Sequence, residues 1–404
     1  MKYVVFLGDG MADLPVEELN NLTPLDCASH PGMDLIAQKG RFGMTQTIPQ
    51  GMPAGSDVAN MSVLGYDPRI YYSGRSPFEA LSIGIDLKPE DVTYRCNLVT
   101  LSEESQMEDA TMIDYSAGEI DSDTARENIV WMQKAFNSER IAFYPGISYR
   151  HCLVLRDASV GAQTVPPHDI SGKPIRAFLP KGNNADLLRT MMKFSYQKLN
   201  KLPVNKERAE KGLNSANAVW LWGEGRKPSL PSFKTKYNVC GGMISAVDLL
   251  QGIAKSIEME KIAVSNITGN YHTDFAAKGK AAIQALDNGL DFVYIHVEAP
   301  DECGHHGELK EKIWSIEQID QLIIQPVLQY LENSKEDFGV LVMPDHPTPL
   351  KILTHSSDPV PFAMYFKGDE RQRNVRFTEQ DARGTGIFEP EAFQLMNHLI
   401  KKDY

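Results

Sequence analysis

The chain has 404 residues, of which 42% are hydrophobic and 23% charged, and its formal net charge is −12. This composition is ordinary for a globular protein, and the acidic balance disfavours nucleic-acid binding, which needs a basic face. No signal peptide and no membrane-length apolar run is visible, so we expect a cytoplasmic protein without a membrane partner. The five cysteines have no CxxC spacing and indicate reduced thiols rather than a disulfide framework.

The first predicted elements lead to a polar strand end and a short loop. Residues 2–8 form an apolar run that ends at Asp9, and residues 31–39 are typical of a helix that stops at Gly40. Residues 49–56 are rich in Gly and Pro, and a short helix is expected directly after them. Ser56 would therefore lie at or near a helix N-terminus, where free N–H groups favour anions.

The middle of the chain has a different sequence pattern. Between about residues 86 and 185, short alternating runs predict the strands of an α+β unit, with a helix over 121–137. The stretch 186–212 is polar and partly helical, and the apolar run 218–223 suggests a return to the buried sheet. Further on, residues 308–333 predict a long amphipathic helix with a bend expected at Pro326.

Two more apolar runs end in acidic residues and histidines. Residues 292–297 lead to Asp301 and His305, and residues 338–343 lead to Asp345-His346, with His355 soon after. Buried parallel strands read as continuous apolar runs, and ligands of such sheets bind beyond the strands' carboxyl ends. The three strand ends are therefore expected to converge.

These segments predict a doubly wound α/β core with a mostly parallel sheet, made from both ends of the chain. The predicted core covers residues 1–85 and 186–404, and an α+β cap is inserted at 86–185. Every candidate for metal binding lies in the outer segments, which supports this division.

Carboxylate and imidazole together form a ligand set for divalent metals. Six such ligands and one hydroxyl suffice for two metals, which would suit phosphoryl transfer with Ser56 as nucleophile. Taken singly, several of these residues also have a plain structural interpretation. Asp9 could belong to a turn, Ser56 could be an N-cap, and His296 is interpreted as a core histidine.

The motifs occur in the order of a known family. They are Gly8-Asp9-Gly10-Met11-Ala12-Asp13, Pro53-Ala54-Gly55-Ser56-Asp57, Ala299-Pro300-Asp301-Glu302-Cys303-Gly304-His305, Pro344-Asp345-His346 and Thr354-His355-Ser356. With these segments the chain resembles the cofactor-independent phosphoglycerate mutases of archaeal type, within the alkaline phosphatase superfamily. The resemblance covers nearly the whole chain.

The resemblance implies a glycolytic isomerase that interconverts 3-phosphoglycerate and 2-phosphoglycerate through a phosphoserine on Ser56. It implies two divalent metals, often manganese, although zinc, magnesium and cobalt also suit such ligands. One metal would be held by Asp9, Ser56, Asp345 and His346. The other would be held by Asp301, His305 and His355.

The chain departs from the family pattern in three places. Asn60 stands where the family commonly has histidine, and Ser76 replaces a glycine in its Gly-Arg-Gly-Pro motif. Residues 114–119 read Asp-Tyr-Ser-Ala-Gly-Glu where the family often has Asp-Arg-Arg-Ala-Gly-Arg, so three arginines are absent. The remaining candidates for substrate contacts are Arg75, Arg95, Arg150, His151 and Lys173, each of which could equally be a structural ion-pair residue.

The missing arginines leave alternatives open, because arginine is the natural bidentate partner of carboxylate and phosphate. A branch of the family has been proposed to act as homoserine kinase, and Glu119 would suit an ammonium-bearing substrate. A metal-dependent phosphatase and a non-enzymatic binding protein are further hypotheses. In each enzymatic case the partner is a small molecule, and the sequence leaves the oligomeric state open.

Overall fold

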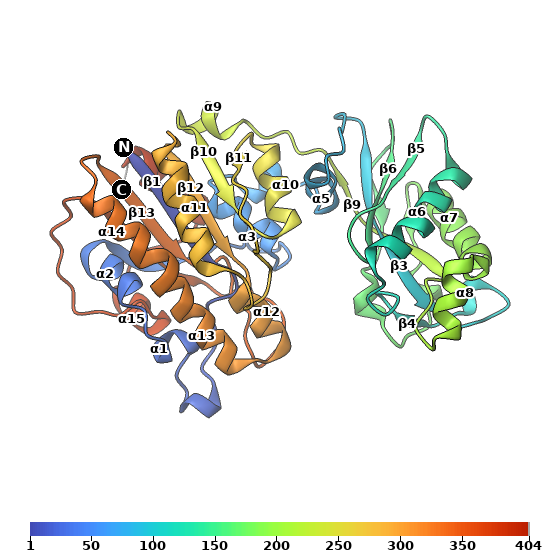
Figure 1. Cartoon of the computed structure of the whole chain (residues 1–404), viewed down its shortest axis with the longest axis horizontal. Helices are drawn as coiled ribbons and strands as arrows, with labels where there is room; N and C mark the ends of the chain where they lie inside the picture. Colours follow the sequence, from blue (N-terminus) through green and yellow to red (C-terminus); the bar gives the residue numbers. More distant parts are fainter. Residues whose placement is uncertain (403–404) are drawn as a thin grey trace. The chain divides into compact units, whose positions relative to one another are not determined.

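The computed structural model describes residues 1–402 and divides the chain into two compact units. The first unit comprises residues 1–72 and 230–404, and the second comprises residues 73–229 (Figure 1). The second unit is therefore wider at both ends than the insertion predicted at 86–185. Its role as a cap stays a prediction.

The first unit contains an eight-stranded mixed sheet in the order β11-β10-β12-β1-β13-β14-β2-β15. The strands are β1 (Lys2–Gly8), β2 (Arg41–Thr45), β10 (Gly241–Ile244), β11 (Glu260–Lys261), β12 (Phe292–Val297), β13 (Phe338–Met343), β14 (Val360–Phe366) and β15 (Phe388–Glu389). Strand β1 pairs in parallel with both β12 and β13. Every residue of β12 and β13 is buried, which accounts for their continuous apolar sequences.

Helices cover both faces of this sheet. They are α1 (Pro24–Cys27), α2 (Pro31–Lys39), α3 (Ser56–Val63), α4 (Pro68–Tyr71), α9 (Phe233–Tyr237), α10 (Asp248–Ser256), α11 (Phe275–Asp287), α12 (Ala299–His306), α13 (Leu309–Ile319), α14 (Gln325–Asn333), α15 (Glu379–Gly384) and α16 (Leu395–Lys401). On one face Val4 and Phe6 pack with α2, α11 and α14, and Figure 1 shows α11 and α14 lying over the strands. On the other face the Tyr3 hydroxyl donates a hydrogen bond to Ile400 O in α16. The doubly wound, mostly parallel core is thereby confirmed.

The long helix predicted over residues 308–333 is interrupted. Between α13 and α14 lies a π-helical segment, Asp320–Ile324, which ends two residues before Pro326. Proline lacks the N–H that an α-helix would need at this point, and a π-turn relieves the clash of its ring. Asp320 is buried there and accepts hydrogen bonds from the N–H groups of Gly32 and Met33, so it ties the turn to the start of α2.

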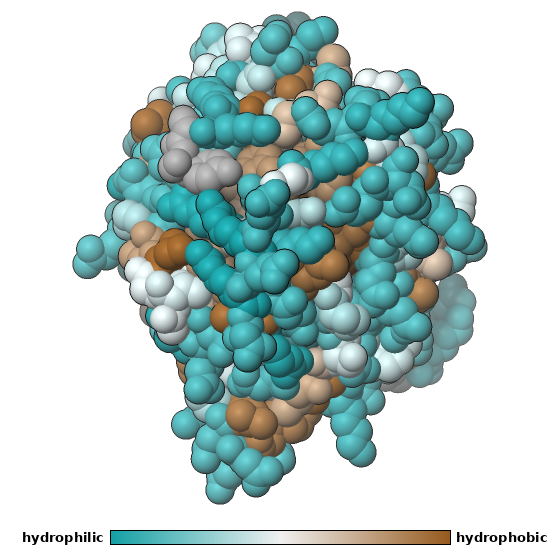
Figure 2. All heavy atoms as spheres, turned by 90° about the vertical axis from the view of Figure 1, so that its left-hand side faces the viewer, coloured by the Kyte–Doolittle hydropathy of each residue, from teal (hydrophilic) through white to brown (hydrophobic). Residues whose placement is uncertain are grey.

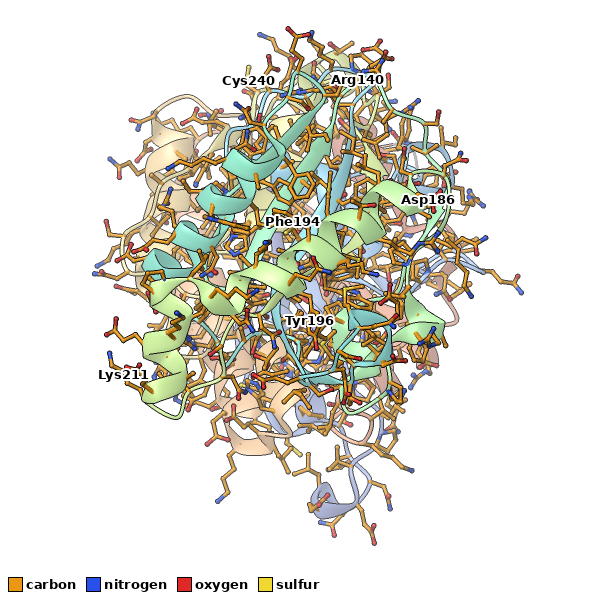
Figure 3. The ribbon with its side chains drawn as sticks, turned by 90° about the vertical axis from the view of Figure 1, so that its right-hand side faces the viewer. Arg140, Asp186, Phe194, Tyr196, Lys211 and Cys240 are labelled. Carbon is orange, nitrogen blue, oxygen red and sulfur yellow. The ribbon has the colours of Figure 1, made fainter. Side chains whose placement is uncertain are left out.

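The second unit contains a five-stranded antiparallel sheet. Its strands are β3 (Val92–Leu101), β4 (Met112–Asp114), β5 (Ile141–Tyr144), β6 (Arg150–Leu155) and β9 (Ala218–Arg226), and β7 (Ala162–Gln163) pairs separately with β8 (Lys181–Gly182). The helices are α5 (Ser76–Ser82), α6 (Ser122–Phe136), α7 (Ala185–Lys198) and α8 (Pro203–Glu210). Figure 3 shows α7 with Phe194 and Tyr196 on this unit; the ring of Phe194 stacks on Trp131 of α6.

One strand assignment from the sequence was wrong. The run 218–223 was expected to return to the main sheet, but it belongs to β9, which pairs with β3 in the second unit. The two tryptophans of β9, Trp220 and Trp222, are buried in the core of that unit. A buried central strand of an antiparallel sheet has the same apolar sequence as a buried parallel strand, so the sequence did not distinguish them.

One face of the first unit is shown in Figure 2, where hydrophilic residues predominate and hydrophobic residues form small separate areas. Among the helices of the described residues, none combines the length and apolar character that a membrane crossing requires.

Candidate two-metal site

The three strand ends meet as the sequence predicted. Strands β12, β1 and β13 are neighbours in the sheet. Asp301 follows the carboxyl end of β12, Asp9 that of β1 and Asp345 that of β13. These three aspartates, Asp9, Asp301 and Asp345, are 1%, 4% and 0% exposed, so three carboxylates lie together away from water. Such a group is unfavourable unless cations or hydrogen bonds compensate it.

One group of side chains combines Asp9, Asp345 and His346. The Nε2 atom of His346 lies 3.5 Å from Asp9 Oδ1 and 3.4 Å from Asp345 Oδ2. Burial and the charges of Asp345 and Asp301 raise the pKa of Asp9 well above its usual range. Its Oδ1 atom is buried without a hydrogen-bond partner. An orphaned carboxylate oxygen among other ligands is what a bound cation would satisfy.

A second group combines Asp301, His305 and His355. The Nε2 atom of His305 lies 3.3 Å from Asp301 Oδ2, and that of His355 lies 3.4 Å from Asp301 Oδ1. Burial alone would raise the pKa of Asp301, but its contacts with the imidazoles outweigh burial and hold that pKa well below its usual range. This group has the carboxylate–imidazole composition that divalent transition metals prefer.

Ser56 lies beside the first group. It is the first residue of α3, and its Oγ atom lies 3.0 Å from His346 Nε2. Gly55 precedes it with an extended backbone, and the helix continues through Asp57, which accepts a hydrogen bond from the Tyr72 hydroxyl. The structure thus places the predicted nucleophile at the start of a helix and against a predicted ligand.

Thr348 connects the two groups. Its hydroxyl donates to Asp301 Oδ1 and lies 3.3 Å from His346 Nδ1. The carbonyl of Thr348 accepts a hydrogen bond from Lys312 Nζ at 2.8 Å, and the same ammonium contacts Asp13 Oδ2 at 2.7 Å. Lys312 is fully buried, and this pairing explains how its charge is tolerated. Sequence analysis did not identify either Thr348 or Lys312.

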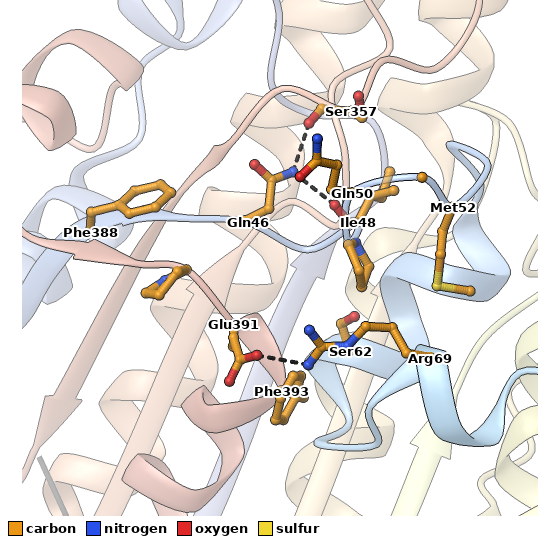
Figure 4. Close-up of a pocket in the computed structure, with 13 residues that line it drawn as sticks. Gln46, Ile48, Gln50, Met52, Ser62, Arg69, Ser357, Phe388, Glu391 and Phe393 are labelled. Atoms are coloured by element: carbon orange, nitrogen blue, oxygen red, sulfur yellow. Dashed lines mark hydrogen bonds and ion pairs between the residues drawn. The ribbon is translucent and has the colours of Figure 1, made fainter.

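A cavity of about 760 Å³ adjoins the segment that leads to Ser56. Figure 4 shows Gln46 in its wall, donating hydrogen bonds to Ile48 O at 3.0 Å and Ser357 O at 2.7 Å. Ser357 follows His355 by two residues, so one side-chain amide joins the segment before the nucleophile to the segment that carries a predicted ligand. On the opposite wall, Arg69 pairs with Glu391 at 2.7 Å.

The second unit brings three of the five predicted substrate contacts together. Arg75 Nε lies 2.8 Å from Glu79 Oε1, and Arg95 Nε lies 2.8 Å from Glu79 Oε2. Burial would raise the pKa of Glu79, but the charges of Arg95, Arg75 and Arg150 lower it. We call Arg75, Arg95 and Arg150 the arginine group; with Glu79 it retains a net positive charge, which suits an anionic ligand.

The other two predicted contacts have different surroundings. His151 is 5% exposed, and its Nδ1 accepts a hydrogen bond from Gly146 N at 3.0 Å. Burial, with the charge of Arg126, lowers its pKa to about 3, so it is neutral at physiological pH. Lys173 is exposed, and its Nζ donates to Asp169 O at 3.0 Å.

Comparisons with known proteins extend over the whole chain. A model of the family "2,3-bisphosphoglycerate-independent phosphoglycerate mutase" matches residues 37–205. A protein of that name from Methanosarcina barkeri is 46% identical over 405 residues, covering 99% of this chain and 100% of the relative. A probable enzyme of the same name from Geobacter sulfurreducens is 43% identical over 403 residues, covering 100% of both chains.

The chain belongs to the 2,3-bisphosphoglycerate-independent phosphoglycerate mutase family, and to its archaeal type.

Solved structures agree on the fold of this mutase-family chain. A Pyrococcus horikoshii protein superposes with a TM-score of 0.82 at 28% identity, covering 99% of this chain and 96% of the other. The cofactor-independent phosphoglycerate mutase of Thermoplasma acidophilum gives a TM-score of 0.67 at 24% identity, with 100% of both chains covered.

The structure shows the surroundings of two segments in which the chain departs from the mutase pattern. Asn60 is fully buried, and its Nδ2 donates to both Ser56 O and Asp345 Oδ2 at 2.9 Å. It therefore links the predicted nucleophile to a predicted metal ligand. In the segment 114–119, the Asp114 carboxylate accepts hydrogen bonds from the N–H groups of Ser116 and Gly118 and from Asn214 Nδ2, each at 2.8 Å. This aspartate therefore has a structural role in fixing the turn.

Proposed function

We propose that this mutase interconverts 3-phosphoglycerate and 2-phosphoglycerate through a phosphoserine on Ser56, with two divalent metals bound. The observation that carries the proposal is the contact of Ser56 Oγ with His346 Nε2, because His346 belongs both to the buried group with Asp9 and Asp345 and to a group with Asp301 and His355. Family membership supports the reaction, and the position of Ser56 supports its proposed role as the nucleophile. The native metal is proposed to be manganese, and the location is proposed to be the cytoplasm.

The donor sets fit such metals. Asp9, Asp345, His346 and Ser56 would hold one cation, and Asp301, His305 and His355 would hold the other. Bound there, divalent cations would favour the ionised serine and offset the charge of the phosphoryl oxygens. The unpartnered Oδ1 of Asp9 and the shared environment of the three aspartates are consistent with this assignment.

The reaction divides into two displacements at phosphorus. In the first, Ser56 Oγ forms a bond to phosphorus, the bond from phosphorus to the substrate's 3-oxygen breaks, and the proton that Ser56 Oγ gives up passes to that oxygen. In the second, the 2-hydroxyl of the retained glycerate forms a bond to the same phosphorus, the bond to Ser56 Oγ breaks, and the proton of the 2-hydroxyl returns to Ser56 Oγ. The backbone N–H groups at the start of α3 would favour the phosphoryl charge throughout.

We further propose that the arginine group contacts the substrate's anionic parts. Glu79 holds Arg75 and Arg95 by their Nε atoms and so fixes the planes of both guanidinium groups. Held in this way, arginine side chains lose little further entropy when they bind a carboxylate or phosphate. His151 and Lys173 stay weaker candidates, the first because it is buried and neutral.

The deciding experiment measures 2-phosphoglycerate formation from 3-phosphoglycerate by the manganese-loaded full chain, without added 2,3-bisphosphoglycerate. We expect turnover in the wild type, a phosphorylated Ser56 in the trapped intermediate, and neither in Ser56→Ala. Turnover that persists in Ser56→Ala would refute the phosphoserine step. Absence of turnover, with phosphohomoserine formed from homoserine and a phosphoryl donor, would favour the kinase alternative.

A further inference from the structure

Two side chains of β12 reach toward the first ligand group from the sheet. Tyr294 and His296 are two residues apart on one strand and therefore lie on the same face of the sheet. Both are fully buried. Neither was identified as functional from the sequence, where His296 was interpreted as a core histidine.

Tyr294 acts through Asn60. Its hydroxyl donates to Asn60 Oδ1 at 2.7 Å, while Asn60 Nδ2 donates to Asp345 Oδ2 and to Ser56 O. Turning the amide over would place its oxygen against the Asp345 carboxylate and the Ser56 carbonyl, so the tyrosine hydroxyl favours one orientation of the amide. Burial, with the charges of Asp345 and Asp9, raises the pKa of Tyr294, so the donor keeps its proton.

His296 acts on the other carboxylate directly. Its Nε2 lies 2.9 Å from Asp9 Oδ2, and its Nδ1 lies 3.2 Å from Ser245 Oγ. Donation from Nε2 to Asp9 and acceptance at Nδ1 from the Ser245 hydroxyl satisfy both nitrogens. The arrangement leaves Asp9 Oδ1 without a protein donor.

The second ligand group is oriented by other residues. His305 Nδ1 lies 3.0 Å from Leu353 O, Asp301 accepts from Thr348, and His355 Nδ1 lies 3.4 Å from Ala54 O. Apart from Thr348, which also lies 3.3 Å from His346 Nδ1, the supports of the two groups come from different segments, and a change on β12 should affect them unequally.

We infer that Tyr294 and His296 are positioning residues for only one of the two metals, the one assigned to Asp9, Asp345, His346 and Ser56. The inference rests on the proposed function, since it assumes that both groups bind metal. Tyr294 fixes Asp345 through the Asn60 amide, and His296 fixes Asp9. Together they keep the remaining oxygen lone pairs of both carboxylates directed toward His346.

The test is Mn²⁺ titration of the metal-stripped full chain by calorimetry, with metal content measured after gel filtration. We expect two metals in the wild type. Tyr294→Phe and His296→Leu should weaken one of them about 10–100-fold, the usual cost of removing a residue that orients a ligand, and leave the other unchanged. His296→Gln keeps a side-chain donor and should recover most of the lost affinity.

Tyr66→Phe is the matched control, because Tyr66 is equally buried in the first unit and donates its hydroxyl to Pro231 O at 2.9 Å, on a segment that supplies no ligand. It should bind both metals as the wild type does. His355→Ala removes a ligand of the other group. Combining His355→Ala with Tyr294→Phe in one variant therefore shows which metal Tyr294→Phe weakens.

Different failures would have different meanings. Two metals in the wild type with unchanged affinities in Tyr294→Phe and His296→Leu would overturn this inference and leave the proposed function standing. Equal weakening of both metals, or the same weakening in Tyr66→Phe, would also overturn it, because a general loosening of the fold would then suffice. A wild-type chain that binds no divalent metal would refute the proposed function itself. Should His296→Leu fail to fold, Tyr294→Phe alone decides.

Discussion

The Nε2 atoms of His305 and His355 lie 2.9 Å apart, and the two rings approach the same carboxylate, Asp301, from α12 and from the segment after β13. Two imidazole nitrogens at this separation share a proton or a cation, since two lone pairs or two N–H groups would repel each other. Contact with Asp301 raises the pKa of His305 to about 9 in spite of its burial, so in the metal-free chain this ring is protonated at neutral pH.

His305→Ala should therefore remove one of two bound metals. The adjacent His306 supplies the matched control, because it is exposed and lies 4.0 Å from Glu308, so His306→Ala should keep both metals. Removal of metal by a chelator should lower the unfolding free energy of the wild type, by about 2.7 kcal/mol per site if the metal had been present at roughly 100 times its Kd. Metal analysis and thermal unfolding with and without EDTA check both expectations. Equal metal content in the two variants would contradict the assignment of His305.

Arg95→Lys should weaken substrate binding while preserving charge. Lysine cannot reproduce the guanidinium that Glu79 holds at Arg95 Nε, nor its planar fork. Loss of one charge-assisted hydrogen bond of about 1.5–3 kcal/mol corresponds to a rise in KM for 3-phosphoglycerate of roughly 10–100-fold. Steady-state kinetics with Arg140→Lys as control test this, because Arg140 is an exposed residue of the same unit whose contact is Asp157 at 3.7 Å. An unchanged KM in Arg95→Lys would remove the arginine group from the proposed substrate contacts.

His151 should make the second unit sensitive to acid. Burial lowers its folded-state pKa to about 3, whereas an unfolded histidine has a pKa near 6.5. Below pH 6.5 the unfolded chain binds the proton that the folded chain excludes, so stability falls as the pH falls from about 6.5 toward 3. By linkage this amounts to on the order of 2 kcal/mol at pH 5.

His151→Asn keeps an acceptor for Gly146 N and removes the titration, so its unfolding free energy should fall less between pH 7 and pH 5 than that of the wild type. Urea unfolding followed by tryptophan fluorescence is suited to this measurement, because Trp131, Trp220 and Trp222 belong to the second unit. Parallel pH dependences for the two proteins would show that His151 is not responsible.

Gly10→Ala should disrupt the centre of the site. Gly10 has φ +60°, and a Cβ there would lie 2.5 Å from Thr348 Oγ1 and 2.6 Å from Asp301 Cα. Backbone strain and overpacking together predict a loss of about 2–5 kcal/mol. Gly51 has φ +85° with open space around a Cβ, so Gly51→Ala should cost only about 1–2 kcal/mol of strain. Urea unfolding compares the two variants. Similar losses of unfolding free energy would mean that Thr348 moves aside at little cost.

The strand ends could be predicted from the sequence because a continuous apolar run that stops at a charged residue is typical of a buried parallel strand at its carboxyl end. Asp9, Asp301 and Asp345 follow three neighbouring strands, and Ser56 begins α3, as their flanking residues indicated. Local patterns also sufficed for α2, whose bounds at Pro31 and Lys39 agree with the predicted helix.

The supports of the site were not predictable in the same way. His296 lies inside a strand, where a buried histidine usually has a structural role, and its contact with Asp9 depends on the pairing of β12 with β1. Thr348 and Lys312 likewise meet only through tertiary packing. The pairing of Glu79 with both Arg75 and Arg95 could not be predicted either, because Arg95 lies on β3, outside the helix that carries Glu79.

The division of the first unit into two sequence segments has a consequence for biosynthesis. Strand β1 leaves the ribosome early, but its neighbours β12 and β13 follow roughly 280 residues or more later, which at 5–20 residues per second is a delay on the order of 15–60 s. During that time the second unit, which is one continuous segment, can complete its own sheet, while the apolar residues Val4, Val5, Phe6 and Leu7 lack their native partners. The nascent chain therefore carries an unpaired hydrophobic strand for most of its synthesis. During this interval the exposed strand β1 would be a binding site for a chaperone.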